Sequence, residues 1–280
     1  MYISDEMIER FIKEDIPYLD LTTLVLGIGS KLGQIRFMAR EDMVLSAAEE
    51  VRRIFGKLGI NVSRLLPTGT LVKKEETFII ADGLATNLHM AWKVSLNLLE
   101  YCCGIATKTK NLVDKAKSIN PDVAIVATRK SFPGTKELAV KSVVAGGGYP
   151  HRLGLSETIL IFKQHMNFMG GLEELPKEIK QIRSNAYEKK IIVEVENKAE
   201  AIMLAEAGVD GIQFDKVPAS DLKQIVDSIR RINPNITLIA AGGINGGNVQ
   251  EYADTGVDTI ATTSVYFGKP ADIKVTMERL

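Results

Sequence analysis

The sequence contains little cysteine, and this limits how the fold can be held together. Its 280 residues include two cysteines, Cys102 and Cys103, which are adjacent. Adjacent cysteines rarely bridge each other without strain, so a disulfide framework is excluded and a reducing cytoplasm is the expected location. No Cys/His spacing of the kind that binds zinc occurs.

Two further absences narrow the class of protein. The 35 basic and 35 acidic residues leave no formal net charge, which argues against a general binder of nucleic acid or of membrane surfaces. No apolar run reaches the length of about 18 residues that a membrane span needs, and the acidic N-terminus lacks a signal-type apolar core. We therefore expect a soluble intracellular protein with neither nucleic acid nor membrane as a partner.

Positive charge is nevertheless concentrated locally, between Thr128 and Leu155. Glu137 is the single acid in this stretch, which holds three consecutive glycines, Gly146 to Gly148, and these basic residues: Arg129, Lys130, Lys136, Lys141, His151 and Arg152. Such a cluster fits a substrate with several anionic groups, and glycines let a backbone approach it. The alternative is a solvated basic helix beside a glycine turn. It is disfavoured because Arg129 and Lys130 directly follow an apolar run.

The first hundred residues predict an α+β domain. Apolar spacing predicts helices over Asp5 to Lys13, Ser46 to Leu58 and Leu88 to Thr109, and strands over Gln34 to Ala39 and Phe78 to Ala81. The segment from Asp20 to Thr23 is expected to be a polar turn. We expect this N-terminal domain to span residues 1–103.

From residue 104 to 280 the pattern changes to a regular alternation of strands and helices. Helical segments such as Ala199 to Ala207 and Ala219 to Ile232 separate apolar runs near residues 123–126, 158–161, 191–193, 211–214, 237–240 and 259–260. Such alternation is typical of a parallel sheet, and six or more units without a dinucleotide fingerprint favour a closed α/β barrel. The last residues of the chain can return to the N-terminal domain.

A barrel places chemistry at the carboxyl ends of its strands. The residues that follow the apolar runs there are Arg129, Lys130, Lys163, His165, Glu194, Glu196, Asp215, Gly242, Gly243, Thr262, Thr263 and Ser264. The loops after the last strands suit a phosphate, and Glu196 and Asp215 suit Mg²⁺ or ribose hydroxyls. The alternative is that a glutamate in one of these strands is part of a structural ion pair and that Ala-Gly-Gly is an ordinary turn.

Several ordered motifs resemble one known family along almost the whole chain. They are T-R-K-S-F-P-G from Thr128, G-G-G-Y-P-H-R-L-G-L from Gly146, C-G-I-A-T from Cys103, V-E-V-E from Val193 and A-G-G-I from Ala241. These resemble the quinolinate phosphoribosyltransferase, or nicotinate-nucleotide pyrophosphorylase, family. The resemblance implies an N-terminal open α/β sandwich domain, a C-terminal TIM-like barrel, and a homodimer with shared active sites, with a hexamer as a further assembly.

The family reaction joins a nitrogen heterocycle to phosphoribosyl pyrophosphate (PRPP) with Mg²⁺ and releases pyrophosphate, a pentosyltransferase reaction. For quinolinate it also releases CO₂. By resemblance, Lys130, Glu196 and Asp215 are catalytic, and the two carboxylates hold Mg²⁺, directly or through water. The residues that match the family's acid and pyrophosphate contacts are Arg129, Lys130, His151 and Arg152, and those that match its 5′-phosphate contacts are Gly242, Gly243, Thr263 and Ser264.

Two departures from the family pattern bear on the base that the protein accepts. Lys93 stands where the family has an arginine that reaches across the dimer, and Phe162 stands where it has a lysine. Quinolinate is a dianion and would lose partners in such a site, so these changes suggest a less acidic or larger ring. The departures resemble the ModD branch, associated with molybdate transport, which implies a phosphoribosyltransferase-like enzyme of undefined substrate. Phe162 offers an aromatic face to stack on, and Lys163 is a weaker substitute because adjacent strand positions face opposite sides.

Three other interpretations stay open at this point. The protein could act on quinolinate itself, or it could be a non-catalytic oxyanion-binding protein linked to molybdate metabolism. Retention of Glu196 and Asp215 speaks against the second, because an anion site gains nothing from neighbouring acids. A Schiff-base aldolase that uses Lys130 or Lys163 is the remaining alternative.

Overall fold

The computed structural model describes residues 1–280, and the chain divides into two compact units. The first unit combines residues 1–110, 132–147 and 266–280, and the second combines residues 111–131 and 148–265. No helix combines the length and the apolar composition that a membrane crossing requires.

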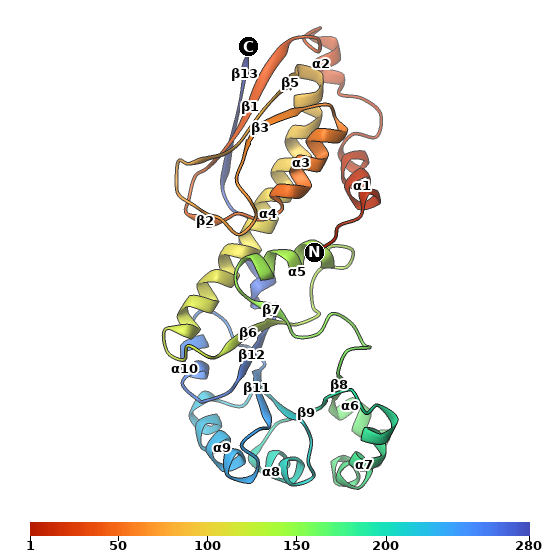
Figure 1. Ribbon diagram of the computed structural model, residues 1–280, viewed down its shortest axis with the longest axis vertical. Helices are drawn as coiled ribbons and strands as arrows, with labels where there is room; N and C mark the ends of the chain where they lie inside the picture. The colour runs from red at the N-terminus through yellow and green to blue at the C-terminus, as the bar shows by residue number, and fades with distance from the viewer. The chain divides into compact units, whose positions relative to one another are not determined.

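A four-stranded antiparallel sheet forms the centre of the first unit (Figure 1). Its strand order is β13-β1-β5-β3, with bounds Ile273–Arg279, Leu32–Ala39, Thr77–Leu84 and Asn61–Leu65. The last strand of the chain thus pairs with the first long one, from Gly33 opposite Arg279 to Ala39 opposite Ile273. A separate short pair joins β2 (Met43–Val44) to β4 (Leu71–Val72).

Five helices complete the first unit or begin in it. They are α1 (Asp5–Asp15), α2 (Leu21–Val25), α3 (Ala48–Lys57), α4 (Ala85–Lys117) and α5 (Lys136–Ala145). The expectation of a turn at Asp20 to Thr23 is wrong. The Asp20 carboxylate accepts a hydrogen bond from the Thr23 backbone N–H at 3.2 Å and so caps α2, because a short polar side chain satisfies a free amide of the first turn.

Alternating burial along β1 explains why this sheet has one packed face. Ile35, Phe37 and Ala39 are buried, whereas Arg36 between them is exposed. The Phe37 ring lies 6.2 Å from that of Phe55 on α3, which is a favourable tilted arrangement. Helix α4 runs without a break through residues 103 and 104, where the domain boundary is expected.

A parallel sheet of seven strands organises the second unit. Its order is β7-β6-β12-β11-β10-β9-β8, with bounds Tyr149–Pro150, Ala124–Ala127, Thr259–Thr262, Thr237–Ala241, Gly211–Asp215, Ile191–Val195 and Ile159–Ile161. All of its pairs are parallel, so the carboxyl ends of the strands lie at one edge. The ladder ends at β7 and β8, which makes the sheet a half-barrel and leaves the expected barrel open there.

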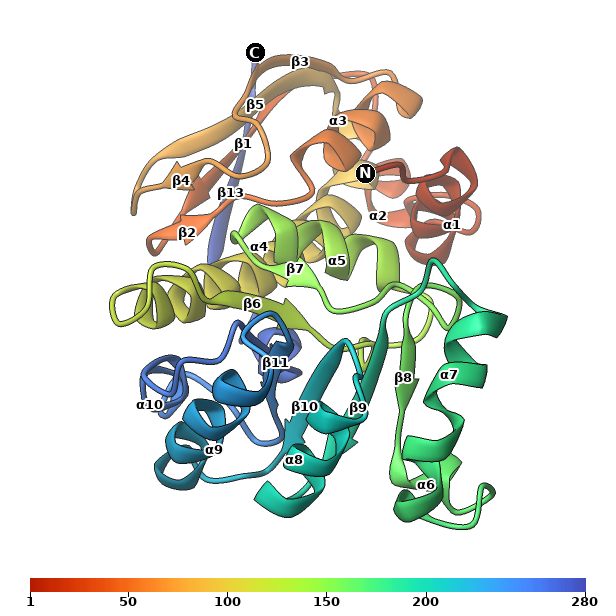
Figure 2. The same ribbon diagram turned by 60° about the horizontal axis from the view of Figure 1, so that its bottom comes forward.

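Helices on the outside of this sheet cover its apolar strands. Helix α8 (Lys198–Glu206) packs on β9 and β10 and beside α9 (Ala219–Ile232), as Figure 2 shows. The other helical elements are α6 (Lys163–Met166), η1 (Leu172–Glu174), α7 (Leu175–Asn185), α10 (Val249–Ala253) and η2 (Ser264–Phe267). Strands covered in this way are buried on both faces, which accounts for their continuous β-branched composition.

Candidate functional site

The inner face of the half-barrel has an apolar floor. Val126, Leu160, Ile192, Ile239, Ala241 and Ala261 form one buried cluster, with Phe162 packed against it. Side chains two residues further along a strand point to the same face. The groups that lie above this floor therefore come from positions 128, 194, 213, 215 and 263, at the carboxyl edge.

The basic side of this edge follows β6. Thr128 Oγ1 lies 2.8 Å from Thr263 Oγ1 after β12, and the Lys130 amide donates to Thr128 Oγ1 at 3.4 Å. This contact ties the two neighbouring strand ends together. Arg129 and Lys130 are both exposed, so their charged groups remain available to an anion.

A second basic group follows β7 and β8. Arg152 is 9% exposed, and its guanidinium carbon lies 5.8 Å from the centre of the Phe162 ring, within the range of a cation–π contact. The His165 ring is stacked on Phe162 at 5.8 Å, and His165 Nδ1 accepts from the Phe162 amide at 3.0 Å. The face of Phe162 expected to stack on a substrate is thus already used in part by Arg152, a contact that the sequence did not indicate.

Burial and like charge act on the basic residues of this group. Burial lowers the pKa of Arg152, and the nearby Arg129 charge lowers it further, against an opposing effect of Glu157. Burial also lowers the pKa of His151, to which the Arg152 charge adds, so the neutral imidazole is favoured. His151 Nε2 is buried and has no hydrogen-bond partner. A buried polar atom of this kind fits a position that meets a ligand.

The acidic side of the edge lies on β9 and β10. Gln213 Nε2 donates to Glu194 Oε2 at 2.6 Å. Burial raises the pKa of the Glu194 carboxyl, and the Asp215 and Glu196 charges raise it further, while the Gln213 hydrogen bond and the Lys130 charge oppose the rise. Three carboxylates and one lysine therefore act on each other at this edge.

Among these acids, Glu194 is the residue that the sequence-based selection of catalytic groups left out. Glu194 lies on the inner face between neighbouring strands, whereas Glu196 is exposed and its backbone amide donates to Glu200 at 2.9 Å. The alternation along β9 could have identified Glu194, since it follows the buried Ile192 by two residues.

The glycine loop after β11 meets the acidic side closely. Gly242 has φ +85°, and a β-carbon there would lie 2.6 Å from Asp215 Oδ1 and 2.6 Å from the Lys216 backbone nitrogen. Glycine is thus required both by conformation and by space. Gly243, at φ +74°, faces open space. Its carbonyl accepts from Asn245 Nδ2 at 3.0 Å.

The last residue of β12, Thr262, ties the segment that follows to the glycine loop. Thr262 Oγ1 donates to the Ile244 carbonyl at 2.6 Å and accepts the Ser264 amide at 3.0 Å. Thr263 and Ser264 are half-buried beside the glycine loop. The structure therefore brings together the expected phosphate residues from β11 and β12.

Among the sequence-predicted residues, Lys93 and Lys141 belong to the first unit, and Lys163 lies at the start of a helix. Lys93, on α4 of the first unit, lies with its ammonium 4.8 Å from the centre of the Trp92 ring. Lys163 is exposed and begins α6. Lys141 is not part of the basic cluster, because on α5 it is ion-paired to Glu49 and Glu50 in the first unit.

Gly146, the first glycine of the run before His151, has a different role from the one expected. A β-carbon on Gly146 would lie 2.3 Å from the Ala106 carbonyl oxygen of α4. This glycine permits a close crossing of α4 and α5 and is not an approach to a ligand.

The carboxylates fit a magnesium ion that arrives with a substrate. The structure has no group of three or more His, Cys, Asp or Glu side chains arranged to hold a metal. Mg²⁺ is usually held by one or two carboxylates together with water and substrate phosphates, not by an all-protein cage. Glu194 and Asp215 interact electrostatically on the inner edge and meet that description.

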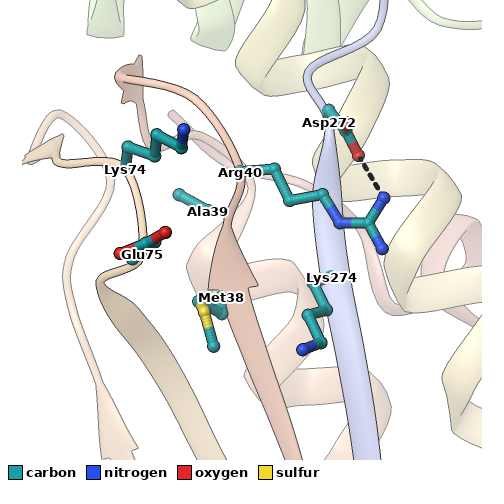
Figure 3. Close-up of a pocket in the computed structure, with 7 residues that line it drawn as sticks. All are labelled: Met38, Ala39, Arg40, Lys74, Glu75, Asp272 and Lys274. Carbon is teal, nitrogen blue, oxygen red and sulfur yellow. Dashed lines mark ion pairs between the residues drawn. The ribbon is translucent and has the colours of Figure 1, made fainter.

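A hollow of about 670 Å³ belongs to the first unit (Figure 3). Its lining consists of Met38, Ala39, Arg40, Lys74, Glu75, Asp272 and Lys274. Arg40 pairs with Asp272 at 3.6 Å, and both side chains are exposed. None of the residues expected in the functional site lines this hollow.

Comparisons with known proteins agree with this arrangement. Residues 20–103 match the family model of the quinolinate phosphoribosyl transferase N-terminal domain, and residues 105–276 match that of its C-terminal domain. The chain is 37% identical to the pyrophosphorylase-type protein ModD of Pasteurella multocida, over 100% of this chain and 99% of that protein. It is 28% identical to the carboxylating nicotinate-nucleotide pyrophosphorylase of Rattus norvegicus, over 93% of this chain and 86% of that protein.

Solved structures give the same result. The nicotinate-nucleotide pyrophosphorylase of Ehrlichia chaffeensis has a TM-score of 0.90 to this chain at 28% identity, covering 99% of this chain and 100% of that one. NadC from Streptococcus pyogenes, at 23% identity and a TM-score of 0.90, shares the fold, with 100% of this chain and 99% of that one covered.

Proposed function

The chain belongs to the quinolinate phosphoribosyl transferase family, and we propose that it is a ModD-like phosphoribosyltransferase that joins a nitrogen heterocycle to PRPP and releases pyrophosphate. One observation carries the proposal. Basic, acidic and glycine-rich segments from six of the seven parallel strands meet at one edge of the half-barrel. PRPP carries two anionic groups on one ribose, and this edge has an anion-binding group on each side of its carboxylates.

In the proposed reaction the bond between ribose C1′ and the pyrophosphate oxygen breaks, and its electron pair leaves with pyrophosphate. The lone pair of the ring nitrogen then forms the C1′–N bond. Glu194, Glu196 and Asp215 face the positive charge that develops on the ribose. Arg129 and Lys130 neutralise the leaving group, so that placement of charge supplies most of the rate.

The two ends of PRPP are assigned to different loops. The Gly242 and Gly243 segment, with Thr263 and Ser264, receives the 5′-phosphate through backbone amides and hydroxyls. Mg²⁺, when bound, supplies charge neutralisation of the pyrophosphate, and Glu194 or Glu196 with Asp215 would hold it directly or through water.

The base is proposed to be an aromatic acid with less negative charge than quinolinate. Phe162 occupies the inner face where a cation could reach a second carboxylate, and it packs on the apolar floor. Arg152 and His151 remain for a single acidic group. Carboxylating transfer to quinolinate is the second candidate, because a protein that carries that name is 28% identical over most of the chain.

Assembly and location are also proposals. We infer a homodimer with shared active sites, in which Lys93 reaches the partner's site, and a hexamer as a further assembly. A cytoplasmic location is supported by the two free, buried cysteines, Cys102 and Cys103. A link to molybdenum metabolism is proposed from the resemblance to the ModD branch.

Titration calorimetry tests the function directly. PRPP is titrated into the protein in the presence of Mg²⁺. Quinolinate and a panel of pyridine monocarboxylates and larger heterocyclic acids are then added to the same cell. The proposal predicts PRPP binding, product formation with a monoacid and none with quinolinate. Binding of inorganic oxyanions without any binding of PRPP would instead identify a non-catalytic oxyanion-binding protein.

A further inference from the structure

Lys216 has a backbone conformation that its residue type disfavours. Its φ is +58°, which makes it one of three non-glycine residues with positive φ. For a residue with a β-carbon, the left-handed region is strained because the β-carbon comes too close to the following carbonyl oxygen. Such strain persists where the surrounding structure imposes it and is concentrated at functional sites. Here it is imposed by the bond from the Lys216 amide to the Ala241 carbonyl, at 2.9 Å.

The side chain of Lys216 lies between the acidic side and the glycine loop. A β-carbon on Gly242 would be 2.6 Å from Lys216 Cγ, so the lysine stem runs over that glycine. The ammonium lies 3.6 Å from Asp215 Oδ2, and the side chain is 77% exposed. The charge is therefore held at the edge without being buried.

The ion pair with Asp215 does not account for the strain. An exposed ion pair contributes little to stability, and 3.6 Å is longer than a direct hydrogen bond. Glycine or asparagine would fit the backbone at lower cost. A lysine at this position thus offers something beyond local stability, namely a mobile cation.

Charge accounting at the edge indicates where that cation is needed. Glu194, Glu196 and Asp215 place three acids on the ends of β9 and β10, and the basic groups Arg129 and Arg152 follow strands β6 and β7. A polyphosphate that crosses from the basic side to the glycine loop would pass the acids. Lys216, directly after β10, carries a positive charge next to these acids.

We propose that Lys216 is a phosphate-binding residue of this site, held beside Asp215 in the free protein and turning to the phosphate groups of PRPP when that substrate binds. The inference rests on the proposed function. The lysine stem above Gly242 fixes the base of the side chain, and rotation about its outer bonds moves the ammonium between the carboxylate and the substrate.

Three variants separate the charge of Lys216 from its backbone. Lys216→Asn removes the ammonium and keeps a residue that tolerates positive φ, Lys216→Gly removes both the ammonium and the strain, and Lys216→Arg keeps the charge. The matched control is Lys223→Asn, since Lys223 is also exposed and paired, to Asp254 at 2.7 Å, on helix α9.

The measurement is the Kd of PRPP and of inorganic pyrophosphate, each with Mg²⁺, by calorimetry at two salt concentrations, with thermal unfolding in parallel. We expect Lys216→Asn and Lys216→Gly to weaken PRPP binding roughly 10-fold, the value of one charge-assisted hydrogen bond, and to reduce its salt dependence. The Kd of PRPP for Lys216→Arg and for Lys223→Asn should stay within about 3-fold of the value for the unmodified protein. The unfolding temperature of Lys216→Gly should not fall below that of the unmodified protein, because the backbone strain is relieved.

Two outcomes would overturn the inference. PRPP affinity unchanged in Lys216→Asn, with normal binding by the unmodified protein, would leave the proposed function intact and reduce Lys216 to an ion-pair residue. An unmodified protein that fails to bind PRPP at all would remove the proposed function and the inference together.

Discussion

The buried ion triad of the first unit gives a prediction whose size follows from the structure. Lys141 Nζ donates to Glu49 Oε2 at 2.7 Å and to both carboxylate oxygens of Glu50 at 2.9 and 2.7 Å. The Lys141 and Glu50 side chains are 14% and 4% exposed, whereas that of Glu49 is 46% exposed. Replacement by methionine, Lys141→Met, fills the space of the stem but leaves two acids without their cation.

Removing one partner of a buried ion pair typically costs 3–5 kcal/mol, because the other charge stays desolvated. Glu50 meets that condition, but Glu49 can regain water, so we expect a loss of about 3 kcal/mol at pH 7. Burial alone would raise the pKa of Glu49, yet the hydrogen bonds from Lys141 and Thr68 outweigh it and bring the pKa to about 2. Because the pKa of Glu49 is lowered, its carboxylate stabilises the fold at pH values above the ordinary pKa of 4.5. This stabilisation is lost as the pH falls towards 2. The difference between the two proteins should therefore shrink from pH 7 to pH 3.

Urea unfolding followed by circular dichroism at pH 7, 5 and 3 measures this difference. Lys57→Met is the control, because Lys57 pairs with Glu9 near the surface at 2.9 Å and its loss should destabilise the fold much less than that of Lys141. Adding Glu50→Gln to Lys141→Met should restore part of the loss, since the uncompensated charge is removed. A loss below about 1 kcal/mol at pH 7, or a difference that grows towards acid pH, would refute the reasoning.

Three further changes test the site. Gly242→Ala should lower PRPP affinity more than 10-fold and lower the Tm, because its β-carbon would lie 2.6 Å from neighbouring atoms, whereas Gly243→Ala, which faces open space, should do so less. Glu194→Gln should abolish turnover in a pyrophosphate-release assay yet raise the Tm at pH 7. Because the pKa of Glu194 is raised, its charged carboxyl is disfavoured in the fold, so the gain in Tm should vanish below about pH 4. An unchanged Tm would contradict the burial of that charge. Arg152→Lys should weaken binding of heterocyclic acids about 10-fold in calorimetry and leave PRPP binding within 3-fold, because the planar fork over Phe162 is lost; equal loss for both ligands would place Arg152 with the phosphates.

Periodicity predicted the second unit well, because buried parallel strands and amphipathic helices have strong local signals. The expected helix from Ala219 to Ile232 matches α9 at both ends, and the apolar run near residue 191 is β9. The sequence analysis expected the last residues to return to the N-terminal domain, but not as a strand of its sheet. Strand β13 pairs with β1 from more than 230 residues away, and although Ile273, Val275 and Met277 alternate with polar residues, this alternation does not identify the partner.

The candidate site was predictable by residue type and by strand end, but not by contact. The sequence placed Arg129, Asp215 and Gly242 at strand ends, and the structure brings the last two into contact. The sequence also counted Lys141 with the substrate cluster, although its partners are acids 91 and 92 residues earlier. Charge alone does not reveal which cation already has a partner.

The sequence by itself determined the family, the alternation of strands and helices, and the order in which basic, acidic and glycine-rich segments follow the strands, because these depend on local pattern and on motifs. Only the tertiary structure decided which of these groups face each other. The parallel register sets Gln213 beside Glu194, and the left-handed turn at Lys216 carries the stem of that lysine over Gly242. Such pairings depend on strand register and backbone dihedrals, which couple residues that are distant in the chain.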